Sequence, residues 1–148
     1  MTFIQKLAKY WLPAISWLGL IFWFSTETFS DDHTASMLKD ILAFLFPAIS
    51  NEAFLLVHIF LRKAAHVTEY FVLSLLLFRA LRGGSVASWN WRWSFLSLVI
   101  VVLWAAADEL HQSFVAVRTA SIVDIGIDIT GGILAQLVIG LAYRYRKK

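Results

Sequence analysis

The sequence contains no cysteine, only two prolines among 148 residues, and few charges: aspartate, glutamate, lysine and arginine make up 16% of it. The lack of cysteine excludes disulfides, thiolate metal sites and a cysteine nucleophile. The low charge accompanies 59% hydrophobic residues, a composition typical of membrane proteins. Because each crossing needs about 20 residues, the chain has room for four spans and for no separate soluble domain.

Four apolar stretches, at about residues 10–26, 54–81, 93–114 and 121–143, predict an all-α integral membrane four-helix bundle in a single domain. The first lacks a small-x-small cleavage site and is rich in Trp and Phe, which favours a retained span over a signal peptide, with Pro13 in its first turn. Gly83 and Gly84 are expected to end the second helix. Between the first two spans, Ser30 and the acids after it predict the start of a short amphipathic helix on the membrane surface, ending before Pro47.

Positive charges predict the orientation. They gather at the N-terminus, in and beside the loop between the second and third spans, and in the tail, whereas residues 27–52 carry one lysine against five acids. Since loops rich in lysine and arginine stay in the cytoplasm, both termini should be cytoplasmic, with residues 27–52 and 113–120 outside. These basic residues lie beside apolar runs, so the expected partner is the membrane lipid and not nucleic acid.

Polar residues interrupt three of the spans: Arg62, Lys63, His66 and Glu69 in the second, Asp108, Glu109, His111 and Gln112 in the third, Asp124 and Asp128 in the fourth. The predicted topology places all of them near the outer face. Arg62, His66 and Glu69 share one helical face, as do Asp108, His111 and Gln112, and Asp124 and Asp128. We therefore expect one polar cluster, with Gly131 and Gly132 letting the fourth helix approach a neighbour closely.

The cluster holds more acid than base. Five carboxylates, on Glu69, Asp108, Glu109, Asp124 and Asp128, face the three permanent cations Arg62, Lys63 and Arg118. A dry bundle does not tolerate two surplus charges. Protonation of His66 and His111, protonation of a carboxylate, a bound cation, or hydration of the outermost groups would each resolve the imbalance.

Four uses of this cluster stay open. In an enzyme the catalytic residues would be His66, Glu69, Asp108 and Glu109, with His66 or Glu69 moving a proton and Asp108 orienting the histidine. In a ligand-binding or proton-relay protein, the ligand-binding residues would be Lys63, Gln112, Arg118, Asp124 and Asp128. A divalent metal would take ligands from His66, Glu69, Asp108 and His111, although their spacing matches no standard metalloprotease helix. Structural ion pairs that lock the helices are the fourth use. The hydroxyl of Ser25, at the outer end of the first span, is also expected to reach this layer.

Two motifs carry a resemblance to a known family. The segment from Lys63 to Tyr70 resembles the K-x-x-H-x-x-E-Y motif of VanZ-like membrane proteins, and Asp108 to Phe114, followed by Arg118 and Asp124, resembles their D-E-x-x-Q-x-F…R…D run. Ser25 stands where the family tends to place a serine. The chain departs from the pattern at Asp128, where the family usually has Asn, and this change adds a carboxylate.

The resemblance implies a bacterial protein of the cytoplasmic membrane in a cell-envelope context. The family is named for a protein associated with resistance to the glycopeptide teicoplanin. A cell-envelope precursor or a glycopeptide is therefore the expected ligand of the outer pocket. The resemblance implies no particular reaction and no cofactor.

Overall fold

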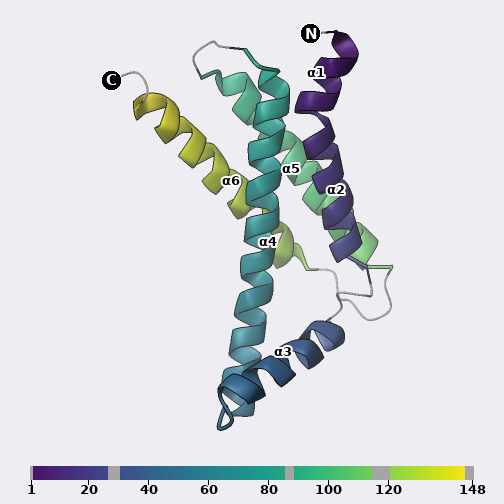
Figure 1. The fold of residues 1–148 in the computed structure, drawn as a ribbon, viewed down its shortest axis with the longest axis vertical. Helices are drawn as coiled ribbons and strands as arrows, with labels where there is room; N and C mark the ends of the chain where they lie inside the picture. Colours follow the sequence, from purple (N-terminus) through teal and green to yellow (C-terminus); the bar gives the residue numbers. More distant parts are fainter. Residues whose placement is uncertain (1, 27–30, 86–88, 115–120, 146–148) are drawn as a thin grey trace.

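The computed structural model describes residues 2–26, 31–85, 89–114 and 121–145, and all regular structure within them is helical. The helices are α1 (Phe3–Tyr10), α2 (Leu12–Phe24), α3 (Asp31–Leu45), α4 (Asn51–Arg82), α5 (Trp91–Gln112) and α6 (Ile122–Tyr145). The start of α1 and the end of α6 lie at one end of the molecule, together with the end of α4 and the start of α5 (Figure 1).

Three of the helices, α4, α5 and α6, are long and apolar enough to cross a membrane. Neither α1 nor α2 alone is long enough to cross a membrane. Taken together they make a fourth candidate span, with a bend of 41° between them. Pro13 lies in the first turn of α2, where its missing N–H needs no partner. The all-helical class and three of the membrane helices are thus as predicted, whereas the predicted first span corresponds to this bent pair of helices, which starts before residue 10.

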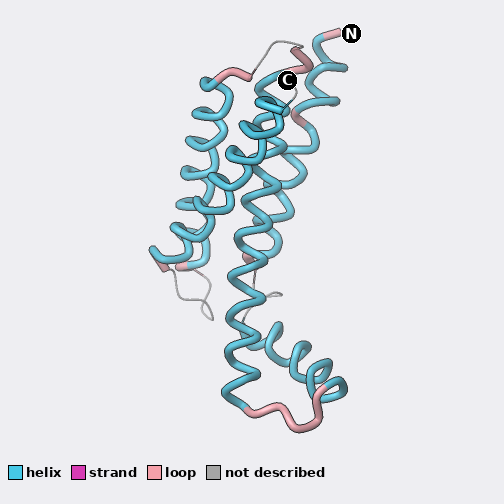
Figure 2. Tube along the Cα trace, turned by 90° about the vertical axis from the view of Figure 1, so that its left-hand side faces the viewer, coloured by secondary structure: helices cyan, strands magenta, loops and turns pink. Residues whose placement is uncertain are grey.

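Local signals fix the ends of α4. Ser50 caps its start by accepting a hydrogen bond from the Ala53 N–H, and Gly83 ends it with a left-handed φ of 58°. The helix therefore has 32 residues and runs past both predicted ends of the second span. Its N-terminal part extends beyond the other spans and pairs with α3 (Figures 1 and 2).

The core lies where α2, α4 and α5 meet, and it consists of Ala14, Ile21, Tyr70, Leu73, Leu77, Val101 and Ala105. On another side of α4, α6 crosses at very short range. A Cβ at Gly131 would lie 2.3 Å from the Val67 carbonyl oxygen, so only glycine permits this approach. Just below the crossing, the Ser74 hydroxyl donates to the Gly132 carbonyl at 3.1 Å, and the Gln136 amide donates to Ser74 at 2.8 Å. These contacts join α4 to α6.

Replacing Gly131 by Ala should lower the free energy of unfolding by about 1–3 kcal/mol, because the new methyl group would press on the α4 backbone. Reversible unfolding of the purified protein in mixed detergent micelles measures the change. Gly126→Ala is the matched control on the same helix, since a Cβ there meets no atom within 4 Å. We expect this control to be neutral or to stabilise by up to about 1 kcal/mol; equal effects at both glycines would contradict the close crossing.

Candidate functional site

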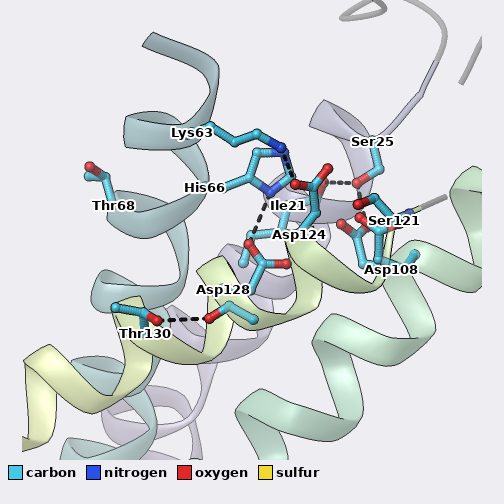
Figure 3. Close-up of polar contacts among 12 residues, drawn as sticks. Ile21, Ser25, Lys63, His66, Thr68, Asp108, Ser121, Asp124, Asp128 and Thr130 are labelled. Carbon is cyan, nitrogen blue, oxygen red and sulfur yellow. Dashed lines mark hydrogen bonds and ion pairs between the residues drawn. The ribbon is translucent and has the colours of Figure 1, made fainter. Parts of the chain in front are cut away.

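Polar side chains from α2, α4, α5 and α6 meet in one layer, at the end of the bundle opposite the termini (Figures 1 and 3). Asp108 and Glu109 come from the last turn but one of α5, and Asp124 and Asp128 from the first two turns of α6. The same layer holds the end of α2 and the middle of α4. Carboxylates as deeply buried as Asp128, which is 0% exposed, are stabilised only by specific partners.

The first partner of the buried acids is a histidine. The Nδ1 atom of His66 lies 3.0 Å from Oδ1 of Asp128, and both side chains are largely buried. The other oxygen of Asp128 has no hydrogen-bond partner among the described residues. A carboxylate that accepts from the Nδ1–H of a histidine fixes the ring's orientation and tautomer, which leaves Nε2 available to exchange a proton.

One helical turn farther out, Lys63 forms an ion pair with Asp124. The Lys63 side chain is 39% exposed and that of Asp124 is 17% exposed, so this pair is nearer the surface than the contact between His66 and Asp128. Lys63 and His66 on α4 thus face Asp124 and Asp128 on α6 (Figure 3). Each of these four predicted residues has its partner on the opposite helix.

A second set of hydrogen bonds joins the C-terminal end of α2 to the last turns of α5. The hydroxyl of Ser25 donates to Oδ1 of Asp108, and the amide of Gln112 donates to Oδ2 at 3.0 Å. All three side chains are buried. Asp108 therefore contacts Ser25 across the helix interface, and His66, the histidine that Asp108 was expected to orient, has a hydrogen bond to Asp128.

The side chain of Glu109, on α5, lies at the start of α6. Its Oε2 accepts the backbone N–H of Ser121 at 2.7 Å, and its Oε1 is buried with no partner among the described residues. Asp124, in the first turn of α6, is paired with Lys63. Glu109 thus helps to hold α5 against α6.

A cavity of about 210 Å³ opens on the α2 and α4 side of this layer. Its lining comes from α2, α3 and α4 and consists of Phe24, Ser25, Thr34, Arg62, Ala65, His66 and Glu69. Ser25 and His66 therefore each have one side toward the cavity and a hydrogen bond to a buried aspartate, Asp108 or Asp128. The carboxylates of Asp108 and Asp128 thus position Ser25 and His66 in the cavity wall.

Two polar lining residues, Arg62 and Thr34, were not among the predicted catalytic, ligand-binding or metal-binding residues. Arg62 was predicted to be a cation of the polar cluster, and its place in the cavity follows from its i, i+4 spacing to His66. No sequence pattern indicated that Thr34 belongs to the site, because Thr34 reaches the cavity only through the packing of α3 on α4. Its hydroxyl lies 3.1 Å from Nε2 of the buried His58, and this contact joins the two helices.

Other predicted residues stand apart. The ring of His111 packs against Phe22, with 4.4 Å between ring centroids, and does not line the cavity. Arg118 lies outside the described residues. The four candidate metal ligands do not form a site, since no group of three or more His, Asp or Glu side chains in the described ranges is arranged to hold a metal ion.

Comparison with known protein families completes this description. The sequence profile of the VanZ/LLP1 family matches residues 10–143, which include every residue of the cluster. The chain belongs to the VanZ/LLP1 family. No curated protein and no solved structure matches the chain. The resemblance of the two motifs is thereby confirmed, and the VanZ/LLP1 motif residues Lys63, His66, Asp108 and Asp124 occupy the polar layer described above.

Reversing the outer ion pair tests its geometry. Lys63→Asp and Asp124→Lys should each lower stability, because each places two like charges opposite one another, and the double variant should recover most of the loss. We expect a coupling energy of about 0.5–1 kcal/mol, as is usual for partly exposed pairs. Unfolding of the two single variants and the double variant in detergent micelles measures it, and additive losses would show that the two side chains do not interact.

Proposed function

We propose that this VanZ/LLP1 protein uses its polar cavity to bind a component of the bacterial cell envelope on the outer side of the cytoplasmic membrane, and so contributes to glycopeptide resistance or envelope modification. The observation that carries the proposal is the cavity itself, lined by Arg62, His66 and Glu69 and supported from behind by Asp108 and Asp128. Its residues provide a guanidinium, an imidazole, a carboxylate and two hydroxyls. Such a set suits a ligand with anionic and hydroxyl groups.

The charges at the far end of the molecule support the outward orientation. Lys9, Arg79, Arg82 and Arg144 lie in the last turns of α1, α4 and α6, at the end that holds both termini. An end rich in lysine and arginine is expected in the cytoplasm. The cavity lies toward the opposite end and would then open on the outer face, where envelope precursors and glycopeptides are found.

A purely structural cluster would explain less of the arrangement. The pairs Lys63–Asp124 and Glu109–Ser121 do hold helices together and need no ligand. Ser25 and His66 differ, because their buried aspartates hold them at the wall of an open cavity. Ionisable groups within a membrane span are expensive, and groups kept beside a cavity at that cost are expected to serve a ligand.

Processing of the ligand is a second candidate, favoured by the contact between His66 and Asp128. With Nδ1 held by the aspartate, Nε2 of His66 would accept a proton from a hydroxyl or a water in the cavity. Processing requires a covalent product in the envelope lipids of cells that carry the wild-type protein, and no such product with His66→Asn. Binding without chemistry gives no product in either case. Mass spectrometry of extracted lipids distinguishes the two.

Removing charge from the site should remove the phenotype without removing the protein. We expect a host that carries the wild-type chain to tolerate more teicoplanin than the empty host. Glu69→Gln or Asp108→Asn should lose most of this gain, because each change removes a carboxylate from the site while it keeps side-chain size. Minimal inhibitory concentration measures the effect, with membrane abundance and melting temperature recorded on the same samples.

The matched control is Glu52→Gln, which alters an exposed carboxylate at the start of α4, far from the cavity. It should behave like the wild type. If the site variants disappear from the membrane or melt much earlier, the cluster has a structural role. If the wild type itself gives no tolerance, the resistance role is wrong.

A further inference from the structure

A second cavity lies at the other end of the bundle from the polar layer, where α4 and α6 end (Figure 1). Its volume is about 460 Å³. The wall is formed by the last residue of α1, the last two turns of α4, the turn that follows α4, and the last turns of α6. We call this space the basic cavity, and its lining consists of Tyr10, Leu75, Phe78, Arg79, Arg82, Gly84, Ile139, Ala142 and Tyr143.

Two arginines line the basic cavity, and hydrogen bonds hold both in place. Arg79 donates to the Lys9 carbonyl oxygen at 3.0 Å. Arg82 donates to the Ser85 carbonyl oxygen at 2.8 Å and to the hydroxyl of Tyr143. Within the described part of the chain, these bonds use one N–H of Arg79 and two of Arg82, whereas a guanidinium carries five. Both side chains are therefore positioned while they keep N–H groups that can donate to a ligand.

A glycine lets α1 close one side of this cavity. Gly84 has a left-handed φ of 82°, and a Cβ on it would overlap the hydroxyl of Tyr10. The guanidinium of Arg79 lies 5.6 Å from the centre of the same tyrosine ring, which is a distance typical of a cation–π contact. The aromatic ring of α1 is thus packed on the turn after α4, and it fixes the position of the arginine at the cavity wall.

The helices around this cavity contain no acidic side chain that could neutralise the arginines. Residues 1–26, 70–107 and 129–148 include no aspartate and no glutamate. These ranges cover α1, the part of α4 that lines the cavity, and the lining part of α6. The counter-ion of the two guanidinium groups is therefore expected from outside these helices. At the end of a transmembrane bundle, the phosphates of anionic lipids are the anions at hand.

The lining becomes apolar toward the middle of the bundle. Along α4, Leu75 lies seven residues before Arg82, which places it about 10 Å nearer the middle. Along α6, Ile139 lies four residues before Tyr143, or about 6 Å nearer the middle. Ala142, between them in the sequence of α6, is exposed, so a hydrocarbon chain can reach the cavity from the bilayer. A phospholipid of the leaflet at this end has the same order, with its phosphate at the membrane surface and its chains toward the membrane centre.

We propose that the basic cavity binds one anionic phospholipid of the leaflet at this end of the bundle, with Arg79 and Arg82 donating to its phosphate and a hydrocarbon chain beside Leu75 and Ile139. Hydrogen bonds between guanidinium and phosphate are charge-assisted and often bidentate, which makes them strong. The inference goes beyond the proposed function, because it concerns a different cavity at the other end of the molecule. The bound lipid would join α1, α4 and α6 at the membrane surface.

The test is binding of phosphatidylglycerol to the purified full-length protein in dodecyl maltoside, measured by native mass spectrometry. We expect one tightly bound lipid per chain. Arg79→Gln and Arg82→Gln should each weaken binding about tenfold, because each removes a charged donor from the cavity. The matched control is Arg92→Gln, which removes the same charge from an exposed side chain at the start of α5, outside the lining. Binding by this control should stay within twofold of the wild type.

The hydrocarbon part of the site is tested from α6. Ala142→Trp should weaken binding of the lipid at least tenfold, because the larger side chain fills the cavity. Leu141→Trp changes the neighbouring position, which is 53% exposed and outside the lining, and should stay within twofold of the wild type. Glycerol 1-phosphate probes the phosphate alone, and we expect it to bind at least a hundredfold more weakly than the lipid.

Three results would overturn the proposal. Equal losses with Arg92→Gln and with the two cavity arginines would show that the overall positive charge of this end attracts lipid without a site. Normal lipid binding by Ala142→Trp would place the hydrocarbon chain elsewhere, and equal affinity for glycerol 1-phosphate and the lipid would make the cavity a site for soluble phosphates. Melting temperatures check the folding of each variant. Because Ala142 is exposed, its variant keeps the test decisive if an arginine variant fails to fold.

Discussion

The close crossing of α4 and α6 at Gly131 is the contact on which the site depends. Because no side chain separates the Gly131 backbone from Val67, the two helices lie near enough for short polar side chains to meet across them. One turn toward the outer end, His66 contacts Asp128, and beyond it Lys63 contacts Asp124. The bonds from Ser74 and Gln136 continue the contact in the other direction. A wider separation of these helices would leave the aspartates buried without partners, which is among the most unfavourable arrangements within a bilayer.

The polar layer combines two tasks in neighbouring residues. Glu109 and Asp124 stabilise helix ends and helix contacts, whereas Asp108 and Asp128 hold Ser25 and His66 beside the cavity. This division explains why acids outnumber basic residues in the sequence of the cluster. Asp108 accepts from a hydroxyl and an amide and Glu109 accepts from a backbone N–H, so part of the negative charge is stabilised by neutral donors, while one oxygen each of Glu109 and Asp128 has no partner among the described residues.

Several features were predictable because they rest on local patterns. Apolar runs marked α4, α5 and α6 as spans, Gly83 marked the end of α4, and the acids after Ser30 marked the start of α3. The convergence of polar residues followed from counting crossings. The bend between α1 and α2 was not predicted, since the apolar run begins where α1 ends and the eight residues before it were read only as a flank.

The sequence by itself determined the helical membrane class, the family and which apolar helices carry the acidic and basic residues of the polar layer, because hydrophobic period, motif spacing and crossing number are properties of the chain order. Only the tertiary structure decided the pairings. The rotation of each helix about its axis paired His66 with Asp128 and Ser25 with Asp108, turned His111 toward Phe22, and brought Thr34 to the cavity. Helix rotation is set by packing against neighbours, such as Gly131 against Val67, and a single chain's pattern specifies it to no better than a residue or two.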